Sequence, residues 1–588
     1  MKRVRYAVVM MIVIMSLLPL YSSAEWVENK DFPLIGDPNA QKGGRLRYAI
    51  ISYPATFRLH GPSSNTTFIN LMSSLVYQTL IDIHPNTMEF IPGLAEAWEI
   101  QDDNSTFLFR INPKAQWEDG QPVSPEDVVF SYELVIDPET KDPYSADLFG
   151  RLFEKPEIVD EYTVKFKAKT LHWRNFMFCG ANLPILPAHT FRGKNYLQDF
   201  NWKLPNGSGP YKLESFRKGR NIVFKRRDDF WANDEREHIG VYNFDRIKFS
   251  VVRDRNLIYE KFKKGEFDYY IVSVARKWVE EMDFDKIQKG WIQKRKIFTS
   301  QPNGVYGLAL NMRQFPFDDL RVRKALNYLY NRPLFTEKLF FNEYVEMHSY
   351  FPGGPYENPR NERIGYDPEK AQSLLAEAGW TERNAQGILE KDGQPFVVTA
   401  LYGDEASERH LTIFQEDLRK AGIELKLKRV DYSTMYKLID ERNFHMANMA
   451  WNALLFPNPE SSYHSKYADI NQTNNITGIT NPKIDTILDA YPEMFEKTER
   501  IEALRELDGL IYQEHPYILN WYAPFTRVLY WNRFGMPECY FSRFGGSDSI
   551  LSTWWFDPQK QAQLDDAMKT GSALEVGTVD VFPWDAQE

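Results

Sequence analysis

The sequence predicts a mixed α/β protein. Strand-like patterns alternate with helical periodicity and helix-capping residues over most of the 588 residues. Hydrophobic residues make up 43% of the chain and aromatic residues 15%, which is enough for substantial cores. At ~150 residues per domain, the length allows about two to four domains. No repeat, low-complexity tract or long Gly/Ser linker separates them, which indicates that the chain crosses between its domains.

The first 24 residues are predicted to be a signal peptide. Lys2, Arg3 and Arg5 form a positive start, and an apolar run of about 15 residues follows. That run is shorter than the ~20 residues needed to span a bilayer. The small residues Ser22 and Ala24 predict cleavage after Ala24, and no cysteine lies nearby to carry a lipid tether. We therefore expect the mature protein in the periplasm.

Runs of alternating or continuous apolar residues predict strands along the whole chain. The first strand follows the Gly43–Gly44 turn, and a hairpin is expected around Lys218–Gly219. In chain order, we expect strands at residues 45–51, 106–111, 164–167, 211–216, 221–225, 247–252, 305–312, 424–430 and 517–522.

Helices are predicted where apolar residues recur every three or four positions between capping residues. Ser124 before Pro125 and two acids predicts a helix start, and Asp319 caps another. Gly422 occupies the position just beyond a helix end. The helices are expected at residues 68–80, from 125 onward, and at 257–264, 320–330, 368–379, 411–421 and 498–515. After about residue 561 the chain is polar and loosely patterned, so we expect a poorly ordered tail.

Charge and cysteine content narrow the function classes. The formal net charge is −10, and the signal peptide contains three basic residues but no acidic one, so the mature chain is more acidic still. Nucleic-acid binding is not expected, because phosphates require a basic face. Cys179 and Cys539 are the two cysteines, and the sequence leaves open whether they form a disulfide. Two thiols do not make a cysteine-based zinc or iron–sulfur site.

Two short motifs of penicillin-interacting enzymes occur in the chain. Residues Ser215 to Lys218 fit S-x-x-K, and Lys569 to Gly571 fit K-T-G. That chemistry requires the serine at a buried helix start, so that the lysine one turn later reaches its oxygen. Here Ser215 ends an expected strand, Lys218 lies in a hairpin turn and Lys569 falls in the expected tail. We therefore predict that the protein is not an enzyme.

Metal and hydrolase chemistry find little support in the remaining motifs. The ten histidines are scattered without metal-ligand spacing, so no metal or other cofactor is predicted. The carboxylate pairs Asp102–Asp103 and Asp228–Asp229 adjoin expected turns and are interpreted as caps. A glycosidase needs two carboxylates across a cleft, and this arrangement stays open as an alternative.

Five blocks of sequence, in matching order, resemble the family 5 extracellular solute-binding proteins of ABC importers. They include a Pro-Gly-Leu-Ala turn before Trp98, Trp117–Gly120 with Val123–Val128, and a Gly-Ser-Gly-Pro-Tyr turn ending at Tyr211. The blocks cover residues 75–98 with 117–128, then 207–231, 262–268, 317–326 and 366–380. Residues 521–524 and 552–557 are most similar to the YejA oligopeptide-binding subgroup. Most of these residues form turns and caps, so the resemblance identifies a fold more than a ligand.

The resemblance implies a two-lobed periplasmic binding protein (Venus-flytrap) with an extra α/β subdomain inserted in lobe I. We place lobe I at residues 25–66, 206–296 and 518–588, the inserted subdomain at 67–205, and lobe II at 297–517. The implied function is capture of a peptide or peptide-like solute between the lobes and delivery to the ABC permease membrane subunits, by a monomer. The alternative is the same carrier fold binding a sugar oligomer, an opine-like conjugate, haem or a metal chelate.

Two segments are expected to contact the ligand. One follows the first strand, and the other is the loop after residue 450. The candidates are Tyr53, Thr56, Phe57, Trp451, Asn452, Leu454 and Asn458. Trp451 is the leading candidate, because large aromatic side chains line such clefts. For each candidate, burial in a core is the competing interpretation, and it is favoured for Phe57 and Phe456.

One position departs from the family pattern. The resemblance implies an aspartate three residues after Trp451, which pairs with the amino terminus of a peptide ligand. This chain has Leu454 there, and Asn458 where a later aspartate is expected. Burying an unpaired ammonium group is costly. The ligand therefore lacks a conventional amino terminus at this point, lies shifted, or is held by another acid such as Glu460.

Overall fold

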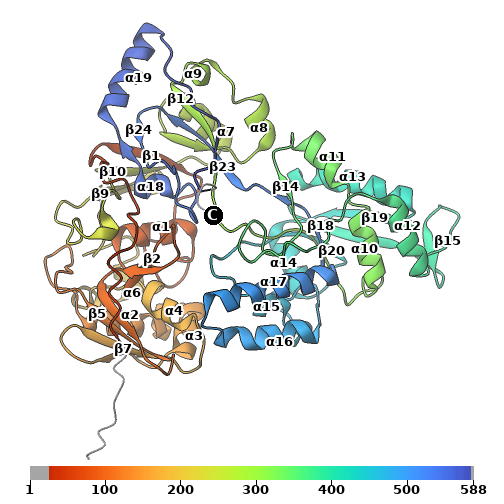
Figure 1. Cartoon of the computed structure of the whole chain (residues 1–588), viewed down its shortest axis with the longest axis horizontal. Coiled ribbons are helices and arrows are strands. Elements are labelled where there is room, and N and C mark those ends of the chain that lie inside the picture. Colours follow the sequence, from red (N-terminus) through yellow and green to blue (C-terminus); the bar gives the residue numbers. More distant parts are fainter. Residues whose placement is uncertain (1–24, 585–588) are drawn as a thin grey trace, which may run out of the picture.

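The computed structural model describes residues 25–584, so the predicted signal peptide lies outside the described residues. Helices and sheets form two bodies (Figure 1). We call residues 305–522 lobe II, which has its own hydrophobic core, and the described residues before 299 and after 524 lobe I. The predicted α/β class is confirmed, because each lobe combines sheets with packed helices.

Lobe I contains two four-stranded sheets. The first has the order β1-β10-β9-β8, in which β1 and β10 are parallel and the other pairs antiparallel. The second has the order β11-β23-β12-β26. The strands are β1 (Arg45–Ile50), β8 (Tyr211–Arg217), β9 (Asn221–Arg226), β10 (Arg246–Val251), β11 (Tyr269–Ile271), β12 (Ile292–Phe298), β23 (Phe525–Trp531) and β26 (Asp580–Val581), with the short pair β24 (Phe534–Gly535) and β25 (Trp555–Phe556). The helices are α1 (Thr67–Val76), α7 (Arg255–Lys263), α8 (Ala275–Glu280), α9 (Asp285–Gln288), α18 (Ser549–Thr553) and α19 (Pro558–Thr570).

Residues 67–205, which we call the insert, add a third sheet of order β4-β5-β7-β6 to lobe I. After α1, the strands are β2 (Ile81–Ile83), β3 (Phe90–Pro92), β4 (Ala95–Ile100), β5 (Thr106–Ile111), β6 (Glu157–Ile158) and β7 (Thr163–Lys167), and the helices are α2 (Pro125–Ile136), α3 (Pro143–Leu152), α4 (Asn175–Ala181), α5 (Ala188–Phe191) and α6 (Tyr196–Asp199). Ser124 and Asp127 form a capping box at the start of α2, as the sequence predicts. One continuous core joins the insert to the β1 sheet, which explains the absence of a linker.

Lobe II is built around a five-stranded sheet of order β19-β18-β20-β13-β21. Its strands are β13 (Tyr306–Leu310), β18 (Val397–Tyr402), β19 (Glu424–Arg429), β20 (Met446–Ala450) and β21 (Tyr517–Leu519), with the shorter β14 (Val345–Glu346), β15 (Glu382–Arg383), β16 (Leu389–Lys391), β17 (Gln394–Pro395) and β22 (Trp521–Tyr522). Its helices are α10 (Leu320–Tyr328), α11 (Arg332–Leu334), α12 (Pro368–Glu377), α13 (Glu405–Ala421), α14 (Tyr432–Asp440), α15 (Glu460–Tyr463), α16 (Pro482–Ala490) and α17 (Lys497–Glu514). Asp319 caps α10 and Gly422, at φ +90°, ends α13, as predicted.

The chain passes between the lobes at two places. The outgoing crossing is residues 299–304, between β12 and β13, and the returning crossing lies between β22 and β23. The return is later than residue 518, because β21 pairs with β13 and buries Ile518 and Leu519 in the lobe II core. The single strand expected at 517–522 is divided into β21 and β22 at Asn520, whose Oδ1 accepts a hydrogen bond from the Tyr330 hydroxyl (2.7 Å).

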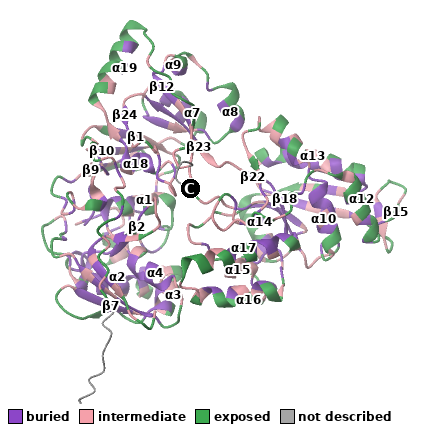
Figure 2. Cartoon of the chain, in the orientation of Figure 1, coloured by how far each residue is buried: buried purple, intermediate pink, exposed green. Residues whose placement is uncertain are grey.

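The prediction of a poorly ordered tail after residue 561 is wrong. Asp557 caps α19, and Leu564 and Ala567 pack into a small third core of lobe I. The rest of α19 is largely exposed (Figure 2), so its apolar signal is too sparse to detect in the sequence. Beyond α19, the Trp291 indole donates to the carbonyl of Ser572 (2.9 Å), and β26 pairs with β12. These contacts order the segment although its side chains are mostly polar.

The S-x-x-K and K-T-G residues do not have the geometry that penicillin-interacting enzymes need, which is a serine at a buried helix start with the lysine one turn later. Ser215 lies within β8, and the Lys218 ammonium lies over the Trp202 ring at 4.5 Å. Lys569 lies in the last turn of α19 rather than in a loose tail.

The two cysteines do not form a disulfide. Cys179 and Cys539 are both free thiols, and burial raises the pKa of Cys539 to about 11.

Candidate ligand-binding site

A cavity of about 360 Å³ lies where the outgoing crossing meets lobe II and the insert. Its wall includes residues 300 and 302–304 of the crossing, Val305, residues 350–352 and 354–356, and the loop after β20. Met88 and Tyr144 of the insert, and Phe544 of lobe I, complete it from the other side. The cavity is therefore shared between the two lobes.

Strand pairing explains why distant segments meet here. β13 and β20 are antiparallel, with Tyr306 opposite Ala450, so the residues before β13 and the residues after β20 emerge at the same end of these two strands. The backbone N–H of Trp451 donates to the carbonyl of Val305 (2.8 Å) and extends this pairing. We call residues 451–459 the ligand loop.

Four of the predicted ligand-contacting residues line the cavity. They are Trp451, Asn452, Leu454 and Asn458, all in the ligand loop. The Trp451 indole N–H donates to the hydroxyl of Tyr517 on β21 (2.9 Å), which fixes the ring against the lobe II core. Tyr350 makes edge contacts with Tyr463 (5.9 Å between ring centroids) and Tyr517 (6.0 Å). The result is an aromatic wall with fixed geometry.

The other three predicted residues lie elsewhere. Phe57 has no exposed surface, and Thr56 is 1% exposed, so neither contacts a ligand in this conformation. Phe57 packs against Trp202 (5.2 Å) and Phe216 (5.1 Å), and Tyr53 belongs to the same aromatic cluster of lobe I. The segment after β1 turns onto this cluster through the Phe57 N–H bond to Asn201 (2.8 Å), which directs it away from the cavity.

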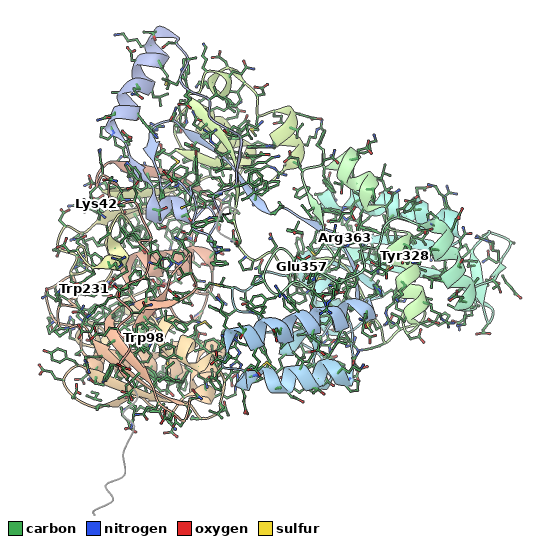
Figure 3. All side chains as sticks on the ribbon, in the orientation of Figure 1. Lys42, Trp98, Trp231, Tyr328, Glu357 and Arg363 are labelled. Carbon is green, nitrogen blue, oxygen red and sulfur yellow. The ribbon has the colours of Figure 1, made fainter. Side chains whose placement is uncertain are left out.

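The cavity wall contains no Asp, Glu, Lys, Arg or His side chain. Leu454 is 57% exposed, and Glu460 forms an ion pair with Lys466 outside the wall. The adjoining loop carries the carboxylate of Glu357 just after the wall residues 354–356, at the edge of lobe II that faces lobe I (Figure 3). Glu357 accepts a hydrogen bond from the Gly353 N–H (2.7 Å), and it forms no ion pair with the described residues. The wall therefore suits an uncharged part of a ligand, because burying an unpaired charge is costly.

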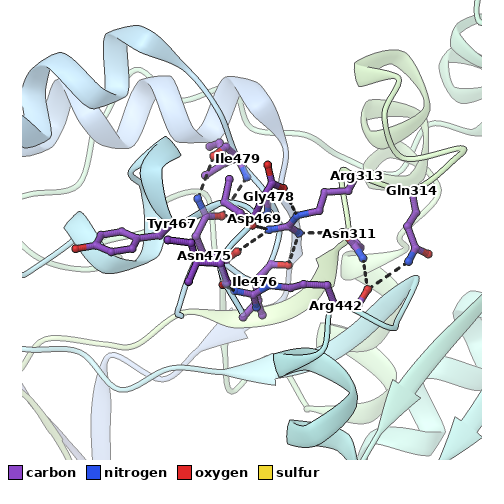
Figure 4. A network of polar contacts seen from close by, with 12 residues as sticks. Asn311, Arg313, Gln314, Arg442, Tyr467, Asp469, Asn475, Ile476, Gly478 and Ile479 are labelled. Carbon is purple, nitrogen blue, oxygen red and sulfur yellow. Dashed lines mark hydrogen bonds and ion pairs between the residues drawn. The ribbon is translucent and has the colours of Figure 1, made fainter. Parts of the chain in front are cut away.

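A polar network fixes a further wall segment that contains Asn474 and Thr477 (Figure 4). The Arg313 guanidinium donates to the carbonyls of Asn475 (3.0 Å) and Ile476 (3.1 Å). The Asn475 side chain accepts the N–H groups of Gly478 and Ile479 (3.0 and 3.1 Å). Sequence reasoning missed these residues, because their partners lie about 160 positions apart in the chain.

Asp508 on α17 holds the loop that contributes Tyr350. Its carboxylate accepts the backbone N–H groups of Tyr350 (2.7 Å) and Asn358 (2.9 Å) and the side-chain amide of Asn361 (2.8 Å). Asp508 is fully buried, and this burial raises its pKa to about 6 despite the three donors. The carboxylate thus sets the position of one side of the cavity.

A glycine lets the crossing approach the ligand loop. A Cβ atom on Gly304 would lie 1.7 Å from the Trp451 carbonyl oxygen. We expect Gly304→Ala to displace the ligand loop and cost about 2 kcal/mol of unfolding free energy, since overpacking forces backbone shifts. Solute affinity should fall by about tenfold or more. Thermal unfolding and calorimetry measure both effects.

Gly365→Ala is the matched control, because no atom lies within 4 Å of the added Cβ and its φ is unstrained. It should leave both quantities unchanged. Equal behaviour of the two variants would show that the close approach at Gly304 has no bearing on the site.

Comparison with known proteins agrees with this architecture. Residues 89–474 match the model for "Bacterial extracellular solute-binding proteins, family 5 Middle". YejA of Escherichia coli (strain K12) is 26% identical, over 91% of this chain and 92% of its own length. YepA of Agrobacterium fabrum, a peptidoglycan-binding protein, is 25% identical over 90% and 92%. The oligopeptide-binding protein AppA from Bacillus subtilis, solved with a nonapeptide, has a TM-score of 0.66 at 22% identity and covers 88% of this chain and 100% of its own.

Two further observations bear on the class of protein. Within residues 25–584, no helix combines the length and apolarity needed to cross a bilayer. In the same range, no three His, Cys, Asp or Glu side chains are grouped to hold a metal ion. The two-lobed fold, the cavity shared between the lobes and the match over most of the chain lead to one assignment: the protein belongs to the family 5 bacterial extracellular solute-binding proteins.

Proposed function

We propose that this protein captures a peptide-like solute in the cavity between its lobes. As a family 5 member it is the solute-binding component of an ABC importer, a binding protein rather than a catalyst. The observation that carries the peptide proposal is the wall itself, which offers aromatic rings and neutral amide groups and no charge. Amides and backbone groups hydrogen-bond an extended peptide, while aromatic faces pack against its side chains.

The uncharged wall also limits how a peptide lies. Its ionised amino terminus stays outside the cavity or is chemically blocked, because Glu460 is engaged by Lys466 and Leu454 provides no charge. The names of the relatives support a peptide-bearing ligand: AppA was solved with a nonapeptide, and YepA binds peptidoglycan, whose strands carry peptides. We further propose that the mature chain begins after Ala24, works in the periplasm as a monomer and delivers its solute to permease subunits.

Isothermal titration calorimetry against three pools tests this proposal. The pools are synthetic tri- to hexapeptides with free amino termini, the same peptides N-acetylated, and neutral oligosaccharides of similar size. We expect heat from the peptide pools, with the acetylated pool binding at least as tightly as the free pool. Binding of the sugar pool alone would contradict the peptide proposal and leave the carrier fold intact. A tenfold preference for free amino termini would show that the cavity does recognise an ionised amino terminus, and would contradict this part of the proposal.

A further inference from the structure

A tryptophan of the insert packs against the core of lobe II. Trp173 lies just before α4, whose residue Phe176 is buried in the lobe I core. The Trp173 ring instead contacts Phe456 (5.9 Å between centroids) and Tyr491 (5.8 Å) of lobe II. Its backbone N–H donates to the carbonyl of Pro492 (2.9 Å), and the Arg500 guanidinium covers its ring at 4.2 Å.

The next residue, Arg174, bonds directly to the ligand loop. Arg174 is 3% exposed, and its guanidinium donates to the carbonyl of Phe456. The neighbours of that residue, Leu455 and Pro457, line the cavity. Their carbonyls accept hydrogen bonds from Tyr356 (3.4 Å) and Tyr491 (3.1 Å). The ligand loop is therefore held by one arginine of the insert and by two tyrosines of lobe II, of which Tyr356 also lines the cavity.

The buried charge in this contact has no ionic partner. Among the described residues, no carboxylate forms an ion pair with Arg174, so its charge is buried against the Phe456 carbonyl and the Trp173 ring, 5.3 Å from the ring centroid. Burial lowers the pKa of Arg174 to about 10, which reflects this uncompensated environment. Separation of the insert from lobe II returns the guanidinium to water and recovers part of its desolvation cost. The contact is thus weaker than a buried ion pair of similar area.

The contact also lies away from the hinge. The crossings join β12 to β13 and β22 to β23, whereas Trp173 lies beside the end of α16, where Figure 1 shows α4 close to lobe II. Rotation of the lobes about the crossings therefore moves the insert toward or away from the ligand loop.

We propose that Trp173 and Arg174 are positioning residues for solute capture: closure of the insert on lobe II fixes the ligand loop in its binding conformation, and opening releases it. The role of the ligand loop in binding a solute rests on the proposed function. The coupling between the position of the insert and the conformation of the ligand loop does not. Bound solute and the contact between the insert and lobe II then favour the same conformation of the ligand loop. Closure of the insert therefore strengthens solute binding, and bound solute favours closure.

Hydrogen exchange of the ligand-free protein tests the coupling without a solute. In Arg174→Met and Trp173→Ala, amides of residues 451–459 should exchange at least about tenfold faster, while those of β13 and β20 keep their wild-type rates. Arg174→Lys retains a charged donor and should restore most of the protection. Arg192→Met is the matched control, since Arg192 belongs to the same insert but pairs with Glu126 at the surface (2.6 Å).

The second measurement is the dissociation rate of the N-acetylated peptide pool, which should rise by about tenfold in Arg174→Met and stay unchanged in Arg192→Met. Unchanged exchange of residues 451–459 in both Arg174→Met and Trp173→Ala would overturn the inference, as would equal acceleration throughout lobe II. Faster loop exchange together with a wild-type protein that binds no peptide would support the coupling and contradict the proposed function.

Discussion

Replacing Trp451 with alanine is expected to weaken solute binding by about 100-fold or more, equivalent to about 3 kcal/mol. The indole lines the cavity and is held by its bond to Tyr517 (2.9 Å), so little conformational freedom remains to be lost when a solute arrives. Trp451→Phe retains the aromatic face but not the N–H, and should lose about tenfold. Calorimetry with the N-acetylated peptide pool measures both variants.

Trp231→Ala is a matched control for this experiment. Trp231 is also partly buried, and its indole N–H also bonds to a side-chain oxygen at 2.9 Å, that of Gln78 in lobe I (Figure 3). Any general cost of removing a half-buried tryptophan should appear in the unfolding temperature of both variants. Loss of affinity confined to Trp451→Ala would locate the solute at the ligand loop; equal affinity in both variants would place it elsewhere.

Asp508→Ala should have the largest effect on stability, a loss of about 3 kcal/mol in the free energy of unfolding at pH 7.5. Three buried N–H groups lose their acceptor, at about 1–3 kcal/mol each, and removal of the carboxylate's own burial cost offsets part of this. Because Tyr350 is one of the donors, solute affinity should fall as well. Urea unfolding monitored by tryptophan fluorescence measures the change, and a loss below about 1 kcal/mol would contradict this role.

The pH dependence at this residue has a definite sign. The folded-state pKa of about 6 lies above the ordinary aspartate pKa of 3.8, so between these pH values the folded protein holds a proton that the unfolded chain has released. The part of the stability that comes from protonation of Asp508 is therefore fully present below about pH 4 and is lost as the pH rises through 6, whereas the hydrogen bonds that its oxygens accept remain at pH 7.5. The stability difference between wild type and Asp508→Asn should change by about 3 kcal/mol across this window. A stability difference that stays constant from pH 4 to 7 would show that the pKa of Asp508 is not raised in the folded protein.

Local signals predicted part of the fold, including β1, β8 and β9 and the helices α2, α10 and α13, but not the strands β12, β18, β20 and β23. The Ser124 capping box, the Asp319 cap and Gly422 marked helix ends that the structure confirms, because each depends on a few neighbouring residues. The helix α19 was missed because only Leu564 and Ala567 are buried on it. Its order comes from tertiary contacts such as that of Trp291 with Ser572, which no local pattern contains.

The candidate site was half predictable. Trp451 was predicted as a ligand contact because large aromatic residues line clefts, and it lies in the cavity wall. Phe57 satisfies the same pattern but packs against Trp202, and composition does not separate a cleft aromatic from a core one. Tyr350, Tyr463 and Tyr517 come together from three distant segments, so their shared wall depends on the sheet order of lobe II.

Native mass spectrometry of the purified protein, followed by denaturation and identification of the released molecules, tests the central claim most directly. The account predicts bound peptide-like molecules of a few residues, with amino termini that are blocked or tolerant of acetylation. The same preparation of Trp451→Ala should carry much less of them. A single non-peptide solute, or a protein that stays empty after incubation with the peptide pools, would contradict the claim.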